Sequence, residues 1–233
     1  MFNNIIRKNL FLSLLLLSLS CFSGNLAADV CGKFDFGPAY LHIDVLQSGH
    51  TIQTLNMPGL RIDSTVIVWK GVCVKPFLTY GGKGSSQIYN LGCGVGHYTP
   101  IGDKCSITPS VGVAYTNFKT HFHVPTSSEV SIVLEEQFQS ISPYVGIDAS
   151  YCFYKGWRLV GSYQYLWSFS QTEIKGQPTT NSQPKGSCYG LMVEYDVNNK
   201  WSINLGAAYN ISLTKEKHGL RGYGARLGFA YWF

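Results

Sequence analysis

The segment WSINLGAAYNISL, residues Trp201–Leu213, alternates between apolar side chains and small or polar ones. Successive side chains of a β-strand point to opposite faces, so its odd positions form one apolar face. The other face carries serine, asparagine, glycine and alanine. A soluble β fold buries its apolar face and turns Lys, Glu and Asp to water, whereas these small uncharged residues suit a crowded polar interior. The pattern therefore favours a membrane β-barrel, with the apolar face toward lipid, over a soluble β fold.

Three more segments show the same alternation, and the composition agrees with it. They are Cys105–Tyr115, Ile141–Tyr151 and Trp157–Phe169. Charged residues make up 13% of the chain and aromatic residues 14%, against about 25% charged residues in soluble domains. Trp157 and Trp167 share a face ten residues apart, which spans about 25 Å of height in a tilted strand. This spacing predicts two aromatic girdles at the membrane interfaces.

The first 28 residues have the features of a cleaved export signal. Arg7 and Lys8 precede the short apolar run Leu10–Phe22, and small residues lie around Ala28. The run is too short for a spanning helix, which needs about 20 residues. We therefore expect residues 1–28 to be a signal peptide and residues 29–233 to form one barrel domain. Removal of the signal peptide lowers the formal charge from +5 to +3, so no nucleic-acid partner is expected.

Short turns alternate with longer polar segments along the mature chain. Tight-turn residues occur at 99–104, 153–156 and 196–200, and longer loops are expected at 47–59, 121–137 and 175–186. Outer-membrane barrels show this asymmetry between periplasmic turns and extracellular loops. The expected fold is an all-β, antiparallel up-and-down transmembrane barrel of eight to ten strands, with ten favoured. The segment Phe34–Val45 changes parity near Gly37–Pro38, as a β-bulge would require.

The C-terminal segment LRGYGARLGFAYWF, residues Leu220–Phe233, places aromatic or apolar residues at alternate positions up to a final phenylalanine. It resembles the C-terminal signal of bacterial outer-membrane barrels, which the barrel-assembly machinery recognises; the matching residues are Tyr223, Leu227, Phe229, Tyr231 and Phe233. The chain is similar to the small-barrel class of OmpX- or OmpW-type proteins. This resemblance implies a location in the bacterial outer membrane, contact with its lipid and assembly by that machinery.

Strand parity predicts a set of charged residues inside the barrel. They are Arg61, Asp63, Lys75, Asp148, Arg158, Glu194 and Arg226, with Tyr144 and Gln164 beside them. Isolated charges are costly in a narrow lumen, so opposite signs should pair. Such a network either fills the barrel or lines a conduction path, and the first interpretation is favoured.

Six cysteines follow the signal peptide, an even number that is compatible with disulfides in an oxidising compartment. Cys105 follows one expected periplasmic turn and Cys152 precedes the next. Folding the hairpin between them brings the two roughly opposite each other, which makes a Cys105–Cys152 disulfide a testable hypothesis. A register slip of one residue would separate them.

Enzyme chemistry would require a nucleophile or an activated water, with a histidine held by a carboxylate. His121 and His123 flank Phe122, and Glu135 and Glu136 follow the same loop. Such residues are more often solvated, so we expect no catalytic site, no metal and no cofactor.

The role expected from the sequence is structural or interactive, through extracellular loops that bind a surface ligand or a host factor. Two alternatives remain open. One is passive passage of small solutes through a narrow lumen, and the other is a lipid- or peptide-hydrolase of the outer membrane.

Overall fold

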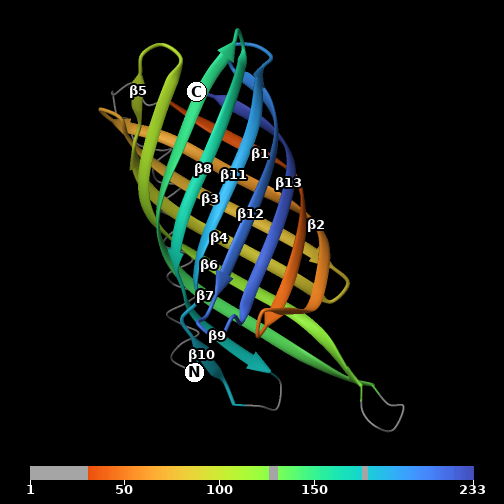
Figure 1. The fold of residues 1–233 in the computed structure, drawn as a ribbon. Helices are drawn as coiled ribbons and strands as arrows, with labels where there is room; N and C mark the ends of the chain where they lie inside the picture. The colour runs from red at the N-terminus through yellow and green to blue at the C-terminus, as the bar shows by residue number, and fades with distance from the viewer. Residues whose placement is uncertain (1–30, 126–130, 175–177) are drawn as a thin grey trace.

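The computed structural model describes residues 31–125, 131–174 and 178–233, which form a closed antiparallel barrel of ten strands (Figure 1). The barrel strands are β1 (Cys31–Gln47), β2 (His50–Trp69), β3 (Val72–Lys83), β4 (Ser86–His97), β6 (Cys105–Pro125), β7 (Ser131–Tyr154), β8 (Trp157–Trp167), β11 (Lys185–Asp196), β12 (Trp201–Leu213) and β13 (Gly219–Trp232). The short strands β5 (Thr99–Ile101), β9 (Phe169–Ile174) and β10 (Thr180–Ser182) extend the sheet at its ends. None of the described segments is a helix able to cross a membrane. The predicted signal peptide, residues 1–28, lies outside the described residues.

Consecutive barrel strands pair with each other, and the first pairs with the last. β1 and β13 are in register from Lys33↔Trp232 to Leu46↔Gly219. Beyond that ladder, Gly32 and Phe233 exchange two backbone hydrogen bonds, of 2.8 and 3.0 Å. Backbone N–H and C=O groups in hydrocarbon must be paired within the chain, and closure meets this requirement. The prediction of an up-and-down barrel with ten strands is confirmed.

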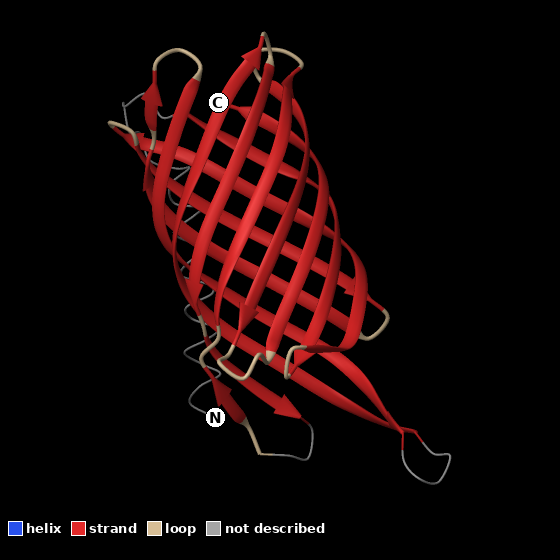
Figure 2. Ribbon diagram, in the orientation of Figure 1, coloured by secondary structure: helices blue, strands red, loops and turns tan. Residues whose placement is uncertain are grey.

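One end of the barrel carries short turns together with both ends of the described chain, and the other carries the long extensions (Figure 2). Periplasmic turns are short in outer-membrane barrels, so the end with Phe233 is assigned to the periplasm. At the opposite end the loop expected at 47–59 is absent. Ser48 and Gly49 form a two-residue turn with φ of 51° and 83°, and His50 already begins β2. Positive φ at both central residues matches the twist of a tight hairpin.

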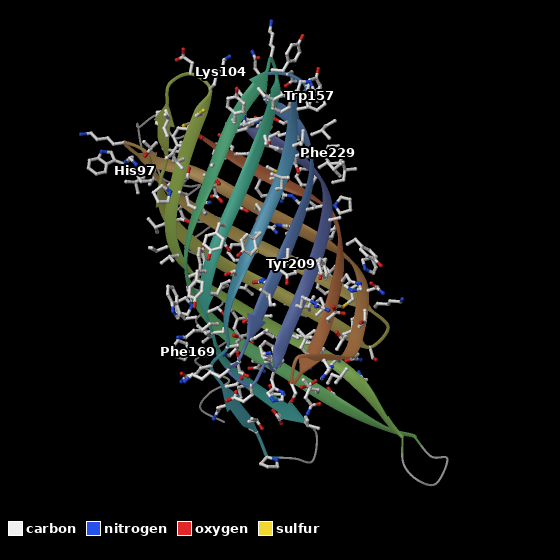
Figure 3. The ribbon with its side chains drawn as sticks, viewed as in Figure 1. His97, Lys104, Trp157, Phe169, Tyr209 and Phe229 are labelled. Atoms are coloured by element: carbon white, nitrogen blue, oxygen red, sulfur yellow. The ribbon has the colours of Figure 1, made fainter. Side chains whose placement is uncertain are left out.

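The outward face carries two bands of aromatic side chains, as the tryptophan spacing predicted. Toward the extracellular end, ring contacts link Tyr163, Tyr189, Tyr209, Tyr223 and His42 across five neighbouring strands. Toward the periplasmic end they link Trp157 to Tyr195 and Trp201 to Tyr231. Figure 3 shows Trp157 and Phe229 near this end and Phe169 near the other. Outward residues between the bands, such as Leu205 at 65% exposure, are apolar.

Beyond the extracellular band the pattern inverts. Ile43, Met57 and Phe118 form an apolar cluster inside the barrel, with Met57 and Phe118 at 0% and 2% exposure. On the outer face at this level, Asp44 accepts hydrogen bonds from Thr54 and Arg221. The barrel wall above the membrane is thus built like a soluble β fold, with apolar residues in and polar residues out.

The β-bulge expected near Gly37–Pro38 is absent, and this inversion explains the pattern that suggested it. β1 keeps one register with β2 from Cys31 to Val45, and the register shifts only between Val45 and Leu46. The apolar residues change face because β1 leaves the membrane beyond the aromatic band at His42, so Ile43 lies inward while the pleat continues unchanged.

Two inward-facing glycines, on β4 and β6, make room for the ring of Tyr144 from the neighbouring strand β7. A Cβ on Gly112 would lie 2.6 Å from the Tyr144 hydroxyl and 2.5 Å from the Cys93 carbonyl oxygen. A Cβ on Gly94 would overlap that same hydroxyl, with its next neighbour, the Val111 carbonyl oxygen, 3.2 Å away. Gly94 and Gly112 are directly paired across β4 and β6. Tyr144 therefore lies flat on the wall because these positions carry no side chain.

We predict that Gly94→Ala destabilises the barrel by about 1–3 kcal/mol, because the new methyl group overpacks against Tyr144. Adding Tyr144→Phe removes the obstructing oxygen and should restore most of the loss. The measurement is the midpoint of urea-induced unfolding in detergent, followed by heat-modifiable gel migration. Gly161→Ala is the matched control, since a Cβ there meets no atom within 4 Å. Equal loss in the single and double variants would contradict the account.

Candidate functional site: a charged belt around the lumen

The barrel encloses a cavity of about 1630 Å³. Its wall includes Asp103 and Lys104 from the periplasmic turn after β5, and Glu216 and His218 from the extracellular turn after β12. The cavity therefore reaches from one end of the described barrel to the other. Eight strands leave an interior just wide enough for side chains to fill. A barrel of ten strands is wider, so its side chains leave part of the interior open.

Charged side chains of alternating sign form a continuous chain along one part of this wall. Salt bridges join Asp196, Arg158, Glu194, Lys33, Asp35, Arg226, Asp63 and Arg61 in that order. These residues come from β8, β11, β1, β13 and β2. Their distances include 2.8 Å for Arg158–Glu194 and 3.1 Å for Arg226–Asp35. Each charge is thereby compensated by neighbours of opposite sign.

Glu194 is the most deeply buried member of the chain, with 0% of its surface exposed. It binds Lys33 and Arg158, and Lys33 reaches it from β1 across β13 and β12. The Trp232 ring lies against both cations, 5.3 Å from the Lys33 Nζ atom and 4.9 Å from the Arg158 Cζ atom. A buried carboxylate between two cations and an aromatic ring is tolerated because its charge is paired.

A separate pair closes the belt on the opposite wall. Lys75 on β3 binds Asp148 on β7 across β4 and β6. Lys75 is paired in register with Gly94, Gly94 with Gly112 and Gly112 with Tyr144, whereas Asp148 is paired with Thr108, four residues further along β7. The belt of five basic and five acidic residues is neutral, since Lys75 and Asp148 add one charge of each sign to the chain.

All seven charged residues predicted from parity lie in this belt, and Tyr144 and Gln164 line the same cavity. Three members were missed. Lys33 and Asp35 lie in β1 before the bulge expected near Gly37–Pro38, and that expectation prevented their assignment to a face. Asp196 was assigned to a turn, whereas it is the last residue of β11.

The structure corrects the proposed Cys105–Cys152 disulfide. Cys105 is paired with Tyr151, and Cys152 donates its backbone N–H to the Lys104 carbonyl at 2.8 Å. This one-residue offset places the two thiols on opposite faces of the sheet. Cys105 and Cys152 are both free thiols.

Of the two histidines considered for a catalytic or metal site, the structure describes the side chain of His121. His121 is paired in register with Glu135, and its carbonyl oxygen accepts a hydrogen bond of 3.1 Å from Gln53. Its buried Nδ1 atom has no partner. The described residues hold no group of three potential metal ligands, and the side chain of His123 lies outside them.

The residues of the C-terminal pattern lie on the outer face of β13. Tyr223, Leu227, Phe229 and Phe233 are 39–46% exposed, and Tyr231 is partly buried. Tyr231 contacts both Trp201 and Phe233. Their recognition by the assembly machinery stays a prediction.

A family model of the Protochlamydia outer membrane protein (Pom) family matches residues 78–225. The chain belongs to this family. The match covers more than half of the sequence and includes strands β4 to β12 entirely. The Pom chain is therefore a protein of the bacterial outer membrane, as the sequence predicted. A comparison with curated proteins found no match.

Several solved outer-membrane structures share the fold of this Pom chain. The outer membrane protease OmpT of Escherichia coli is 11% identical, with a TM-score of 0.55 over 88% of this chain and 96% of that one. The translocator domain of the autotransporter NalP of Neisseria meningitidis is 10% identical, with a TM-score of 0.51 over 98% and 97%. The beta domain of the Bordetella autotransporter BrkA is 7% identical, with a TM-score of 0.50 over 88% and 100%. At sequence identities this low, the structural similarity establishes a shared fold alone.

We predict that Glu194→Gln lowers the free energy of unfolding by about 3–5 kcal/mol, because it leaves Lys33 and Arg158 without their shared buried carboxylate. Urea-induced unfolding in detergent measures the loss. Adding Lys33→Met restores charge balance and should recover part of it. Glu173→Gln, at an exposed position of β9, is the matched control. A loss no larger than that of the control would show that the belt does not stabilise the barrel.

Proposed function

We propose that this Pom-family barrel allows passive passage of small polar solutes across the outer membrane. The observation that supports this best is the cavity, whose wall includes turn residues from both ends of the barrel. The apolar cluster of Ile43, Met57 and Phe118 occupies the extracellular half beside β1, β2 and β6. The open part of the lumen lies beside this cluster, which Ile88, Phe138 and Leu220 extend toward β4, β7 and β13.

The wall formed by β11, β12 and β13 keeps this part of the lumen open. Its inward positions carry small residues, among them Gly190, Gly206, Ala208, Gly222 and Gly224. A Cβ on Gly222 or Gly224 would meet its nearest atoms at 3.7–3.8 Å, an ordinary contact distance. Both positions accept a Cβ and line the cavity, so a larger side chain there would occupy part of the lumen.

The test is occlusion of the lumen by Gly224→Phe. We expect proteoliposomes containing the unmodified protein to swell faster in a small neutral solute, such as glycerol, than protein-free liposomes. Gly224→Phe should reduce that rate severalfold, because the ring fills the open part of the lumen. Ala225→Phe is the matched control, since Ala225 lies on the lipid face of the same strand. Swelling equal to that of protein-free liposomes, or no effect of Gly224→Phe, would exclude passage through the lumen.

Surface interaction is a second candidate, supported by the extracellular sheet. β6 and β7 continue to pair from Thr120↔Glu136 to Pro125↔Ser131, beyond Lys119, the last partner of β4 (Figure 1). β9 and β10 continue the sheet on the other side of β7, and β10 forms its edge. A projecting sheet with an unpaired edge can bind an extended segment of a partner protein through backbone hydrogen bonds.

We expect replacement of residues 122–134 by an Asn-Gly turn to remove this surface while leaving the barrel folded. His121 and Glu135 are paired in register, so a two-residue turn can join them. Heat-modifiable migration should match that of the full-length protein, and binding of protein-coated beads to host cells should fall. Unchanged binding by the shortened variant would contradict a role of the hairpin in adhesion.

A further inference from the structure

We infer that the Lys75–Asp148 pair is a binding site for zwitterionic solutes, those that carry an ammonium and a carboxylate group close together, as α-amino acids do. The inference rests on the proposed passage of solutes through the lumen. It names the class of solute and the point of the belt at which it binds.

The Lys75–Asp148 pair differs from the rest of the belt in its connections. In the chain of eight charges, each residue between Arg158 and Asp63 has at least two partners of opposite sign. No salt bridge among the described residues joins Lys75 or Asp148 to that chain. Opening this pair therefore leaves the remaining charges of the belt compensated.

The pair also faces the cavity. The side chains of Lys75 and Asp148 are 19% and 24% exposed, and both line the lumen together with Phe77 and Tyr144. Lys75 reaches Asp148 across β4 and β6, and the Tyr144 ring lies over Gly94 and Gly112. A solute in the lumen therefore meets an ammonium and a carboxylate next to each other.

Charge balance selects the solute. When a zwitterion inserts, its carboxylate binds Lys75 and its ammonium binds Asp148, so every charge in the lumen stays paired. A singly charged anion would leave Asp148 unpaired, and a cation would leave Lys75 unpaired, both of which are costly away from bulk water. A neutral solute of the same size gains no ion pair, so it passes without being retained at this position.

The test compares solutes of similar size in proteoliposomes: L-alanine, the neutral lactamide and the lactate anion. We expect the unmodified protein to pass alanine faster than lactamide at low concentration, and lactate more slowly than either. Lys75→Met and Asp148→Asn should each lower the alanine-to-lactamide ratio by about fivefold, the effect of one ion pair at contact in water. The double variant removes both ion pairs and should lower it further, while keeping the lumen neutral, which preserves the test if a single variant fails to fold.

A second readout separates binding from a structural effect. Asp148→Asn should shift the reversal potential in a KCl gradient toward anion preference and Lys75→Met toward cation preference, whereas the double variant should match the unmodified protein. Lys83→Met, on the same strand at the extracellular turn, is the control for both readouts. An unchanged alanine-to-lactamide ratio in the double variant would overturn the inference while lactamide still passed. If lactamide does not pass the unmodified protein, the proposed function and this inference both fail.

Discussion

The pairing of β1 with β13 is the constraint on which the rest of the molecule depends. A sheet in hydrocarbon has no water to satisfy its edges, so the first strand must meet the last. The chain achieves this with twelve paired positions and the terminal exchange between Gly32 and Phe233. The seam is also where the belt is densest, because Lys33, Asp35 and Arg226 lie on these two strands. Closure and the charge network therefore reinforce each other: the backbone brings the charges together, and their attraction acts across the seam.

The sequence predicted the fold well wherever strands cross lipid, and less well where they leave it. Parity is informative inside the membrane because the two faces of a strand meet opposite environments, lipid and a polar lumen. Above the extracellular girdle, water replaces lipid outside the barrel and an apolar cluster replaces the polar lumen inside it. The apolar Ile43 therefore faces inward and the charged Asp44 faces outward, the reverse of the arrangement within the membrane. A one-residue bulge and a strand that passes from lipid to water produce the same pattern in a sequence. The loop expected at 47–59 was wrong for the same reason, since polar residues such as Thr54 face outward on a regular strand.

The candidate site was predictable in its membership and not in its connections. Parity placed Arg61, Lys75 and Glu194 inside the barrel, because a charge in a lipid-crossing strand has no other favourable place. It could not show that Lys33 reaches Glu194 across two intervening strands, since side-chain contacts across a lumen depend on shear and closure. The predicted disulfide was wrong because of an offset of one residue in strand register. Cys105 and Cys152 differ from a directly opposed pair by one residue, and one residue reverses the face of a side chain.

A belt of paired charges can support a barrel without blocking it, because most of its members lie on one part of the wall. Eight charges occupy the wall from β8 through β11 to β2, where they replace the packing that a ten-strand interior lacks. On the opposite wall the Tyr144 ring covers Gly94 and Gly112, and among the described residues Lys75 and Asp148 form one salt bridge apart from the chain of eight. The glycines keep Tyr144 flat against the wall and leave Lys75 and Asp148 facing the lumen, an arrangement that favours exchange with a solute over permanent packing.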